Sequence, residues 1–485
     1  MSRNKTLPLF AALGFTTLAT AQIALPILPT LPHARTMDLI VGDTTSPDTI
    51  WRMIDRNQDG DYNDAGEVIA YYSDAVGSIA LGTPGAVASM PDGTVLVGDL
   101  GEDVIIAMRD GNGDGDAHDP GEHRVFFDPS NASGVGLYSL QSIVVDQLGR
   151  VFVTNADNGQ GGYDGVFLLE DLNFDGDAQD AGEAREYFAV PVLGGGTGVS
   201  NPFELCAAPD GNLYFVDNGQ GGTITKGIYK LEDLNFDGDC NDAGEYSLFW
   251  VPPTVGGFAF FQSLAVDQNG MFYTGEYTAD DVVWRAYDLN GNGFIDPGED
   301  AEFFNPPSGF WNDIAVRDDG SIVLAEDDSN DRVIVLTDLN GDLDALDPGE
   351  AFEAYDDTIS AVAVRPRSLT FMRAPVLTLT PATVQVGNAT TMLVQTAKPF
   401  DLGAVFLSVG LAPTPISLAP WGFVEIDPSA FEAIGFGLSD STAFFSLPFG
   451  IPNIPTALGT YGVQAWCGDD FRLFLSNGEL LTVTP

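Results

Sequence analysis

The stretch Asp171-Leu-Asn-Phe-Asp-Gly-Asp-Ala-Gln-Asp-Ala-Gly-Glu183 decides how the whole chain is organised. Oxygen-bearing side chains stand at alternate positions, Asp171, Asn173 and Asp175, and Gly176 follows where a tight loop must turn. A hard cation such as calcium takes about 6–8 oxygen ligands at roughly 2.3–2.6 Å. Alternate side chains that point inward supply such ligands, and glycine lets the backbone wrap around the ion. The stretch is therefore predicted to be a calcium-binding loop.

The same pattern occurs six times. The other copies are residues 55–67, 110–122, 233–245, 288–299 and 338–350, and successive copies start 50 to 62 residues apart. One copy alone is compatible with an acidic surface turn, but six copies in register favour a repeated metal site. We therefore predict up to six structural Ca2+ ions. The predicted ligands are Asp55, Asn57, Asp59, Asp61, Asp64, Glu67, Asp110, Asn112, Asp114, Asp116, Asp119, Glu122, Asp171, Asn173, Asp175, Asp177, Asp180, Glu183, Asp233, Asn235, Asp237, Asp239, Asp242, Glu245, Asp288, Asn290, Asn292, Asp296, Glu299, Asp338, Asn340, Asp342, Asp344, Asp347 and Glu350.

Four short apolar runs accompany each loop. In the third repeat these runs are residues 142–146, 150–154, 166–169 and 184–188, and turn-forming or glycine-rich segments separate them. Four short strands in a repeat of this length are typical of one blade of a β-propeller. The calcium loop then joins the third strand of a blade to the fourth, rather than one helix to another.

The first and last repeats are both incomplete. The first begins at residues 38–41 and lacks an innermost strand, whereas residues 360–364 form an additional apolar run after the sixth repeat. We expect this run to complete the first blade, which closes the ring and removes two open sheet edges. The predicted fold is all-β, with a six-bladed propeller over residues 38–366 and a C-terminal strand that closes blade one.

The strand motif Ser263-Leu-Ala-Val-Asp267, followed by Gly270 and Phe272-Tyr-Thr274, resembles six-bladed propellers of the NHL and gluconolactonase-like kind. The loops resemble EF-hand and dockerin calcium loops through their first six positions. In five copies the glutamate comes one residue late, and only residues 288–299 have the standard length, with Ile295 at the usual apolar position. In the five longer loops we expect the aspartate at position ten to share the closing role of the glutamate.

The two ends of the chain differ from the repeats. Arg3 and Lys5 precede an apolar run, and small residues follow it, so residues 1–21 are predicted to be a secretory signal peptide. Residues 22–37 are a proline-rich linker, and no other segment is apolar over the length of a membrane span. Residues 376–485 are predicted to form a small β-sandwich. Through Ile451-Pro-Asn453 and Leu475-Ser-Asn-Gly478, this part resembles C-terminal modules of secreted bacterial proteins.

The composition limits the choice of partners. The 485 residues include 70 acidic and 19 basic side chains, which give a net charge of −51, and 44% of the residues are hydrophobic. Such negative charge disfavours nucleic acid and anionic membranes as partners. Export agrees with the calcium prediction, because extracellular calcium fills even weak sites. The three cysteines do not make a disulfide framework, and their pairing stays open.

A second candidate site lies at the opposite mouth of the propeller tunnel. The resemblance to gluconolactonase-like enzymes implies a central cation held by Glu, Asn and Asp, and Glu204, Asn155 and Asp217 are the matching catalytic candidates. A solvated polar rim, which any propeller needs, is the favoured interpretation of the same residues. His33, His118 and His123 are the only histidines, and none is placed as a general base at the tunnel.

These observations favour a secreted or cell-surface, calcium-binding propeller that acts in extracellular binding or surface architecture. Its expected partners are calcium and a glycan or a surface protein. The alternative is a cation-dependent, lactonase-like hydrolase with its site at the tunnel mouth. The sequence favours the non-enzymatic role over the enzymatic one.

Overall fold

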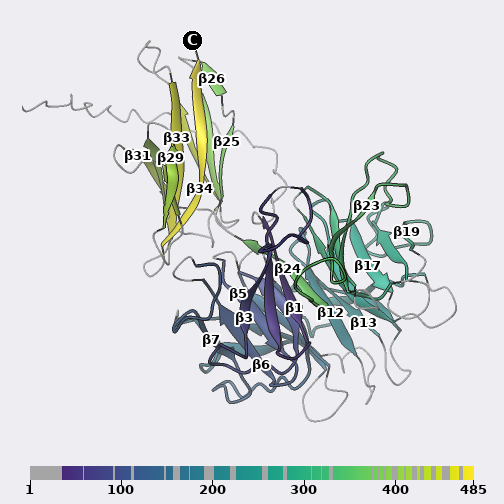
Figure 1. Ribbon diagram of the computed structural model, residues 1–485. Helices are drawn as coiled ribbons and strands as arrows, with labels where there is room; N and C mark the ends of the chain where they lie inside the picture. Colours follow the sequence, from purple (N-terminus) through teal and green to yellow (C-terminus); the bar gives the residue numbers. More distant parts are fainter. Residues whose placement is uncertain are drawn as a thin grey trace, which may run out of the picture.

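The computed structural model describes residues 35–484 with gaps (Figure 1). Up to residue 375 the gaps are residues 58, 91–92, 111–113, 147–148, 157–163, 174, 190–200, 219–224, 254–259, 277–280, 307–308, 318, 327–330 and 374–375. Beyond it they are residues 381–382, 386–388, 396–401, 409–410, 418–422, 427–430, 439–443, 451–458 and 469–472. The predicted signal peptide and most of the predicted linker therefore lie outside the described residues. Strand β1 (Arg35–Asp43) already includes the last linker residues.

Six four-stranded antiparallel sheets form a ring, as predicted (Figure 1). From the innermost strand outward, blade one consists of β24 (Pro366–Arg373), β1, β2 (Thr49–Met53) and β3 (Val68–Ser73), and blade two of β4 (Pro84–Ser89), β5 (Val95–Asp99), β6 (Val104–Met108) and β7 (His123–Phe127). Blade three consists of β8 (Leu140–Val145), β9 (Val151–Asn155), β10 (Gly165–Leu169) and β11 (Ala184–Ala189), and blade four of β12 (Pro202–Ala207), β13 (Leu213–Asp217), β14 (Gly227–Leu231) and β15 (Tyr246–Trp250). Blade five consists of β16 (Phe261–Val266), β17 (Phe272–Glu276), β18 (Val283–Ala286) and β19 (Asp300–Phe304), and blade six of β20 (Trp311–Val316), β21 (Ile322–Glu326), β22 (Arg332–Leu336) and β23 (Ala351–Asp356). No described segment is helical.

The prediction that residues 360–364 close the ring is wrong. These residues form a bent connection, and β24 is the strand that pairs with β1, from Leu39 opposite Phe371 to Gly42 opposite Ser368. The apolar run is instead held by the side chain of Tyr355. The Tyr355 hydroxyl donates to the carbonyl of Val362 (2.6 Å) and accepts the backbone N–H of Val364 (2.7 Å). The predicted propeller boundary at residue 366 thus falls at the start of the closing strand instead of its end.

The hydrophobic core lies between neighbouring blades. One core cluster joins Val323 and Val335 of blade six to Leu39, Val41 and Phe371 of blade one. Because each sheet packs against a blade on both faces, second strands such as β5 and β9 are buried at every position. Burial on both faces explains why these strands form continuous apolar runs instead of alternating patterns.

Residues 376–484 are also all-β in the part that is described. They form a three-stranded sheet in the order β25-β27-β32, a five-stranded sheet in the order β26-β34-β33-β28-β31, and the pair β29-β30. The bounds are β25 (Val376–Thr380), β26 (Thr383–Gln385), β27 (Ala389–Gln395), β28 (Leu402–Ser408), β29 (Leu411–Ser417), β30 (Phe423–Ile426), β31 (Phe431–Leu438), β32 (Phe444–Gly450), β33 (Gly459–Gly468) and β34 (Leu473–Thr484). Packing of the two larger sheets as a sandwich stays a prediction. Nowhere in the described residues is there a helix with the length and apolar character needed to cross a membrane.

Candidate functional site

An acidic loop joins the third and fourth strands of every blade, at the positions predicted from the sequence. In each loop the first aspartate fixes the turn, as in blade one, where Asp55 Oδ2 accepts the backbone N–H of Gly60 at 3.0 Å. Gly60 has a φ of 101°, a conformation that glycine adopts without strain. The other oxygen of this carboxylate, Asp55 Oδ1, is buried and has no hydrogen-bond partner among the described residues. A buried carboxylate oxygen without a partner is unfavourable unless a cation is bound.

The side-chain amide of the asparagine at position three donates hydrogen bonds to two further carboxylates of the loop. Asn57 Nδ2 donates to Asp59 Oδ2 at 2.9 Å and to Asp64 Oδ2 at 2.6 Å. The equivalent contacts recur in blades three, four and six. Rotating this amide by half a turn would place its oxygen where the nitrogen lies. Three ligand oxygens would then surround one point, which is the arrangement that a cation requires.

The closing glutamate is engaged with the loop backbone. Glu67 Oε1 accepts the N–H groups of Arg56 and Asn57, and Oε2 accepts that of Asp64. In the shorter loop, Glu299 accepts the N–H groups of Asn290 and Asp296 in the same way. The one-residue difference in loop length therefore does not change how the glutamate closes the loop.

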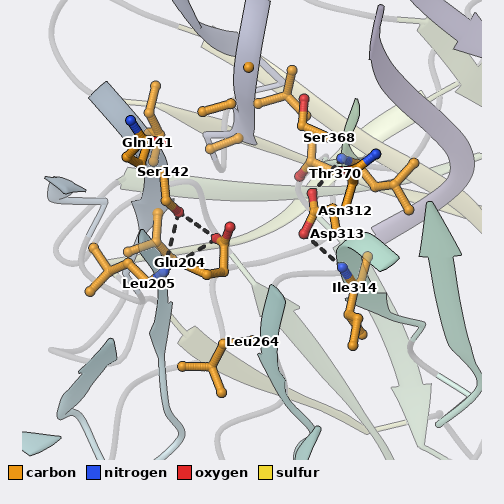
Figure 2. Close-up of a pocket in the computed structure, with 18 of the residues that line it drawn as sticks. Gln141, Ser142, Glu204, Leu205, Leu264, Asn312, Asp313, Ile314, Ser368 and Thr370 are labelled. Carbon is orange, nitrogen blue, oxygen red and sulfur yellow. Dashed lines mark hydrogen bonds between the residues drawn. The ribbon is translucent and has the colours of Figure 1, made fainter. Parts of the chain in front are cut away.

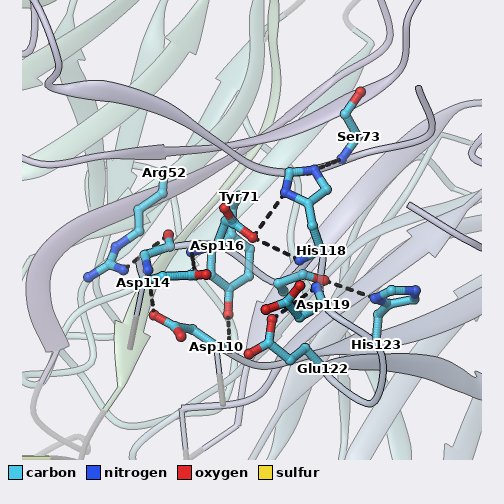
Figure 3. A network of polar contacts seen from close by, with 12 residues as sticks. Arg52, Tyr71, Ser73, Asp110, Asp114, Asp116, His118, Asp119, Glu122 and His123 are labelled. Carbon is cyan, nitrogen blue, oxygen red and sulfur yellow. Dashed lines mark hydrogen bonds and ion pairs between the residues drawn. The ribbon is translucent and has the colours of Figure 1, made fainter. Parts of the chain in front are cut away.

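Two loops bring three carboxylates to one point. Ligand oxygens of Asp114, Asp116 and Glu122 lie within 4.8 Å of one another, and so do those of Asp237, Asp239 and Glu245. Figure 3 shows the blade-two loop, in which Tyr71 of the preceding blade accepts the backbone N–H of Asp110 at 3.1 Å. His118 is not a free base, because its Nε2 accepts the Ser73 N–H and its Nδ1 lies 3.0 Å from Asp116. The predicted ligand Asn112 lies outside the described residues.

Each acidic loop also binds the neighbouring blade. The backbone N–H of the eighth loop residue donates to a carbonyl in the fourth strand of the preceding blade, at 2.7–2.8 Å in all six cases. These residues are 0–3% exposed. The pairs are Tyr62 with Ala354, Ala117 with Tyr71, Ala178 with Phe126, Cys240 with Tyr187, Ile295 with Phe249 and Ala345 with Phe303. The ring of loops is thus a ring of contacts between blades.

At the opposite face, the catalytic candidates Asn155 and Asp217 accept backbone N–H groups of irregular connections. Asn155 Oδ1 accepts the N–H groups of Tyr138 and Ser139, and Asp217 Oδ1 accepts that of Asn201 at 3.4 Å. Both side chains are fully buried and hold the connection that enters their own blade. Neither lines the axial cavity. Of the three candidates, Glu204 alone is among the residues that line this cavity.

Glu204 does line a cavity of about 390 Å³ on the propeller axis, which is bordered by the innermost strands (Figure 2). The cavity contains an acid that the sequence analysis missed, Asp313 of β20. Both acids are the third residue of an innermost strand, and the other strands have Ala86, Ser142, Ser263 and Ser368 there. Alignment of the innermost strands by this position would have found Asp313.

Both acids have a pKa above the ordinary value, chiefly because they are buried. Burial raises the pKa of Glu204 well above its ordinary value, and the charge of Asp313 raises it further. Burial raises the pKa of Asp313 to about 7, against the lowering effect of the N–H groups of Leu369 and Ile314 and the charge of Arg367. The side chains of Glu204 and Asp313 are half-buried in the wall of the cavity. Loss of hydration is the largest cause of the raised pKa of each acid.

No family model matches this chain, and no curated protein does. Solved structures match its fold. PorZ, an essential bacterial surface component of the type-IX secretion system of Porphyromonas gingivalis, is 12% identical with a TM-score of 0.39, and the match covers 92% of this chain and 56% of PorZ. A gluconolactonase from Xanthomonas campestris is 13% identical with a TM-score of 0.37, over 61% of this chain and 85% of that one. A protein from Lactobacillus plantarum is 12% identical with a TM-score of 0.42, over 69% of this chain and 99% of that one. This chain thus spans little more than half of PorZ, and at these identities the likeness concerns the fold alone.

Proposed function

We propose that this chain is an exported, calcium-loaded propeller that acts in binding or surface architecture outside the cell, with calcium in a structural role. The observation that supports the proposal is that each acidic loop has two roles, one in gathering carboxylates and one in the contact with the preceding blade. One side of the loop gathers carboxylates, and the eighth residue of the same loop is hydrogen-bonded to the preceding blade. An ion that orders the loop therefore also orders the contact between two blades.

Electrostatics support a bound cation. Carboxylates within a few ångströms of one another repel when all are ionised, unless a cation compensates them. The preceding blade supplies a little positive charge, such as Arg124, whose Nε donates to the Gly176 carbonyl at 2.7 Å. With 19 basic against 70 acidic residues, the chain cannot neutralise six such loops itself. Divalent ions would remove the repulsion where the blades meet.

A cation-dependent hydrolase of the lactonase-like kind is the second candidate, and the presence of Glu204 in the axial cavity favours it. However, Asn155 and Asp217 hold backbone amides and lie outside that cavity. The non-enzymatic role needs no such set of residues. We therefore prefer the binding or surface-structural function.

The test is a calcium count combined with a thermal melt of the full chain. We expect up to six Ca2+ ions per chain, and a large fall in Tm when a chelator removes them. Each site contributes about 2.7 kcal/mol when free calcium is a hundred times its Kd. The control is chelator pre-saturated with calcium, which must leave Tm unchanged. A Tm that does not respond to the free chelator contradicts a structural role for calcium.

The partner is tested separately. Binding of the calcium-loaded chain to a panel of glycans and to isolated cell-surface fractions is compared with that of the chelated chain. Calcium-dependent binding supports the extracellular binding role. Turnover of a panel of lactones that is lost in Glu204→Gln would instead support the hydrolase.

A further inference from the structure

Four large apolar side chains are exposed in one short stretch of blade six. We call them the blade-six surface: Leu339, Leu343, Leu346 and Phe352. Their exposed fractions are 68%, 53%, 49% and 45%, in that order. The three leucines belong to the acidic loop, and Phe352 is the second residue of β23. Single exposed apolar residues are common on proteins, but a group of them marks an interaction site.

The other five repeats show that the fold does not need this group. Loop position six is glycine in all five, and position nine is Asn, His, Gln, Asn or Asp. The residue equivalent to Phe352, two places after the closing glutamate, is Ile, Arg, Arg, Ser or Ala. Leucine at position two is shared with blades three, four and five. Each of the other blades thus has at most one large apolar residue at these four positions, whereas blade six has four.

Two of the four residues weaken the fold itself. Leu343 has a φ of 73°, a left-handed conformation that a residue with a side chain adopts only at a cost. Leu346 stands where side chains of blades one, two and four accept a backbone N–H group of the preceding blade, and a leucine side chain cannot accept one. Those bonds join the N–H of Asp356 to Asn63, that of Ser73 to His118, and that of Ala189 to Asn241. A partner that buries both leucines would offset these costs.

The charge around the group selects among partners. Residues 338–350 include five carboxylates and no basic side chain, namely Asp338, Asp342, Asp344, Asp347 and Glu350. One bound Ca2+ would change the charge of this loop from −5 to −3, and six would change the net charge of the chain from −51 to −39. A second copy of the chain would therefore be repelled, and so would nucleic acid or an anionic membrane. A basic partner is attracted with or without calcium.

From the exposure, the comparison of repeats and the charge, we propose that the blade-six surface binds a partner protein through a segment in which apolar side chains alternate with Lys or Arg. The apolar side chains of the segment cover the leucines and Phe352, and its basic side chains meet the carboxylates of the loop. The surrounding negative charge also speeds the encounter with such a partner. The inference rests on the proposed binding role outside the cell, but it does not need bound calcium.

The experiment measures binding of labelled peptides to the full chain by fluorescence anisotropy, in calcium-saturated buffer at physiological salt. Three peptides of equal length are compared: one of leucine and lysine, one of leucine and glutamate, and one of serine and lysine. We expect the leucine–lysine peptide to bind about tenfold or more tightly than either of the others, because burial of a single leucine is enough for such a difference. Charge alone would favour both lysine peptides equally.

Variants locate the surface. The triple variant Leu343→Gly, Leu346→Asn and Phe352→Ser introduces residues that other blades have at the same positions, so it is expected to fold, and it keeps every charge. It should bind the leucine–lysine peptide about tenfold more weakly than the parent does. Phe236→Gly is the matched control, because it removes an 89% exposed side chain at a positive φ from the loop of blade four. This control must leave binding unchanged.

The inference is overturned if the triple variant binds the leucine–lysine peptide as tightly as the parent, or if Phe236→Gly weakens binding as much. It is also overturned if the leucine–glutamate peptide binds equally well. A parent chain that sediments as a dimer, while the triple variant sediments as a monomer, would show instead that the surface joins two copies. The calcium count and Tm of the same samples report on the proposed function separately, since a chain without calcium that keeps the peptide preference contradicts only the calcium proposal.

Discussion

Tyr62, in the acidic loop of blade one, donates its backbone N–H to the carbonyl oxygen of Ala354 in blade six, at 2.7 Å. The two residues belong to the first and last repeats, so this bond crosses the point at which the ring closes. The pairing of β24 with β1 is therefore not the only closure of the propeller. The same loop that is proposed to bind calcium provides a second closure.

The hydroxyl of Tyr62 strengthens this second closure, because it accepts a hydrogen bond from Arg317 Nη2 at 3.2 Å. Tyr62→Phe keeps the buried ring and removes the hydroxyl that accepts this bond. We expect the free energy of unfolding to fall by about 1–2 kcal/mol, since a charged donor is left partly unsatisfied. Denaturant unfolding measures the change. Tyr287→Phe, at a tyrosine that is 38% exposed, is the matched variant and is expected to change stability by less.

Calcium removal from one loop should act locally. Asp55→Ala and Asp171→Ala each remove the first proposed calcium ligand of one loop, and each is expected to lower the calcium count by one and stability by up to about 2.7 kcal/mol at hundredfold saturation. Only Asp55→Ala lies in the loop that joins blades one and six. Amide hydrogen exchange in β24 and β23 should therefore speed up in Asp55→Ala and not in Asp171→Ala. Equal exchange in both variants would show that the blade-one loop plays no special part in ring closure.

Much of the propeller could be predicted because its strands and loops repeat. The four strands of each complete blade follow from short apolar runs between turns, and the loops follow from the spacing of Asp, Asn and Gly. The closing strand was misplaced because residues 360–364 are as apolar as a strand, although they pack around the hydroxyl of Tyr355. Local composition cannot distinguish a strand from an irregular connection of similar sequence.

The sites were predicted less completely, because they depend on contacts between repeats. Position eight of every loop is Tyr, Ala, Cys or Ile, and this shared apolar character was a usable signal for the contact with the preceding blade. Asn155 and Asp217 have the residue types of a cation site, but they accept backbone N–H groups of the connections that enter their blades. These connections have irregular sequences, so the sequence alone did not reveal these hydrogen bonds. Asp313 was missed because its partner Glu204 lies two blades away.

Leu343 occupies the sixth loop position in blade six, where five loops have glycine, and its φ is 73°. For a residue with a side chain, this left-handed conformation costs roughly 1–2 kcal/mol. Leu343 is 53% exposed, so its replacement loses little packing. Leu343→Gly is therefore expected to stabilise the protein by about 0.5–1 kcal/mol after the entropic cost of glycine. Leu339→Gly removes a leucine that is 68% exposed from the same loop without relieving a positive φ, and thermal melts should show that it destabilises.

The last prediction concerns pH and the pair Glu204 and Asp313. Both acids have a pKa in the folded protein above their ordinary value, chiefly through burial, and Asp313 reaches about 7. Between about pH 4 and the raised values, the folded state holds protons that the unfolded chain has released, so this pair contributes stability at low pH that is lost as pH rises. Arg367 opposes the shift in both acids, and Cys206, whose own pKa is raised by burial, stays neutral throughout.

Glu204→Gln removes one partner of this pair while Oε1 keeps its contacts with Ser142 and Leu205. At pH 4 the parent acid is protonated, so the variant and the parent are expected to melt at similar temperatures. As the pH rises, the variant should become more stable relative to the parent, because ionisation of the Glu204 side chain near Asp313 is unfavourable in the folded protein. Melting curves from pH 4 to pH 8, with Glu102→Gln as the exposed control, check this. A variant that is less stable than the parent at pH 8 would mean that Glu204 is already compensated in the unliganded protein.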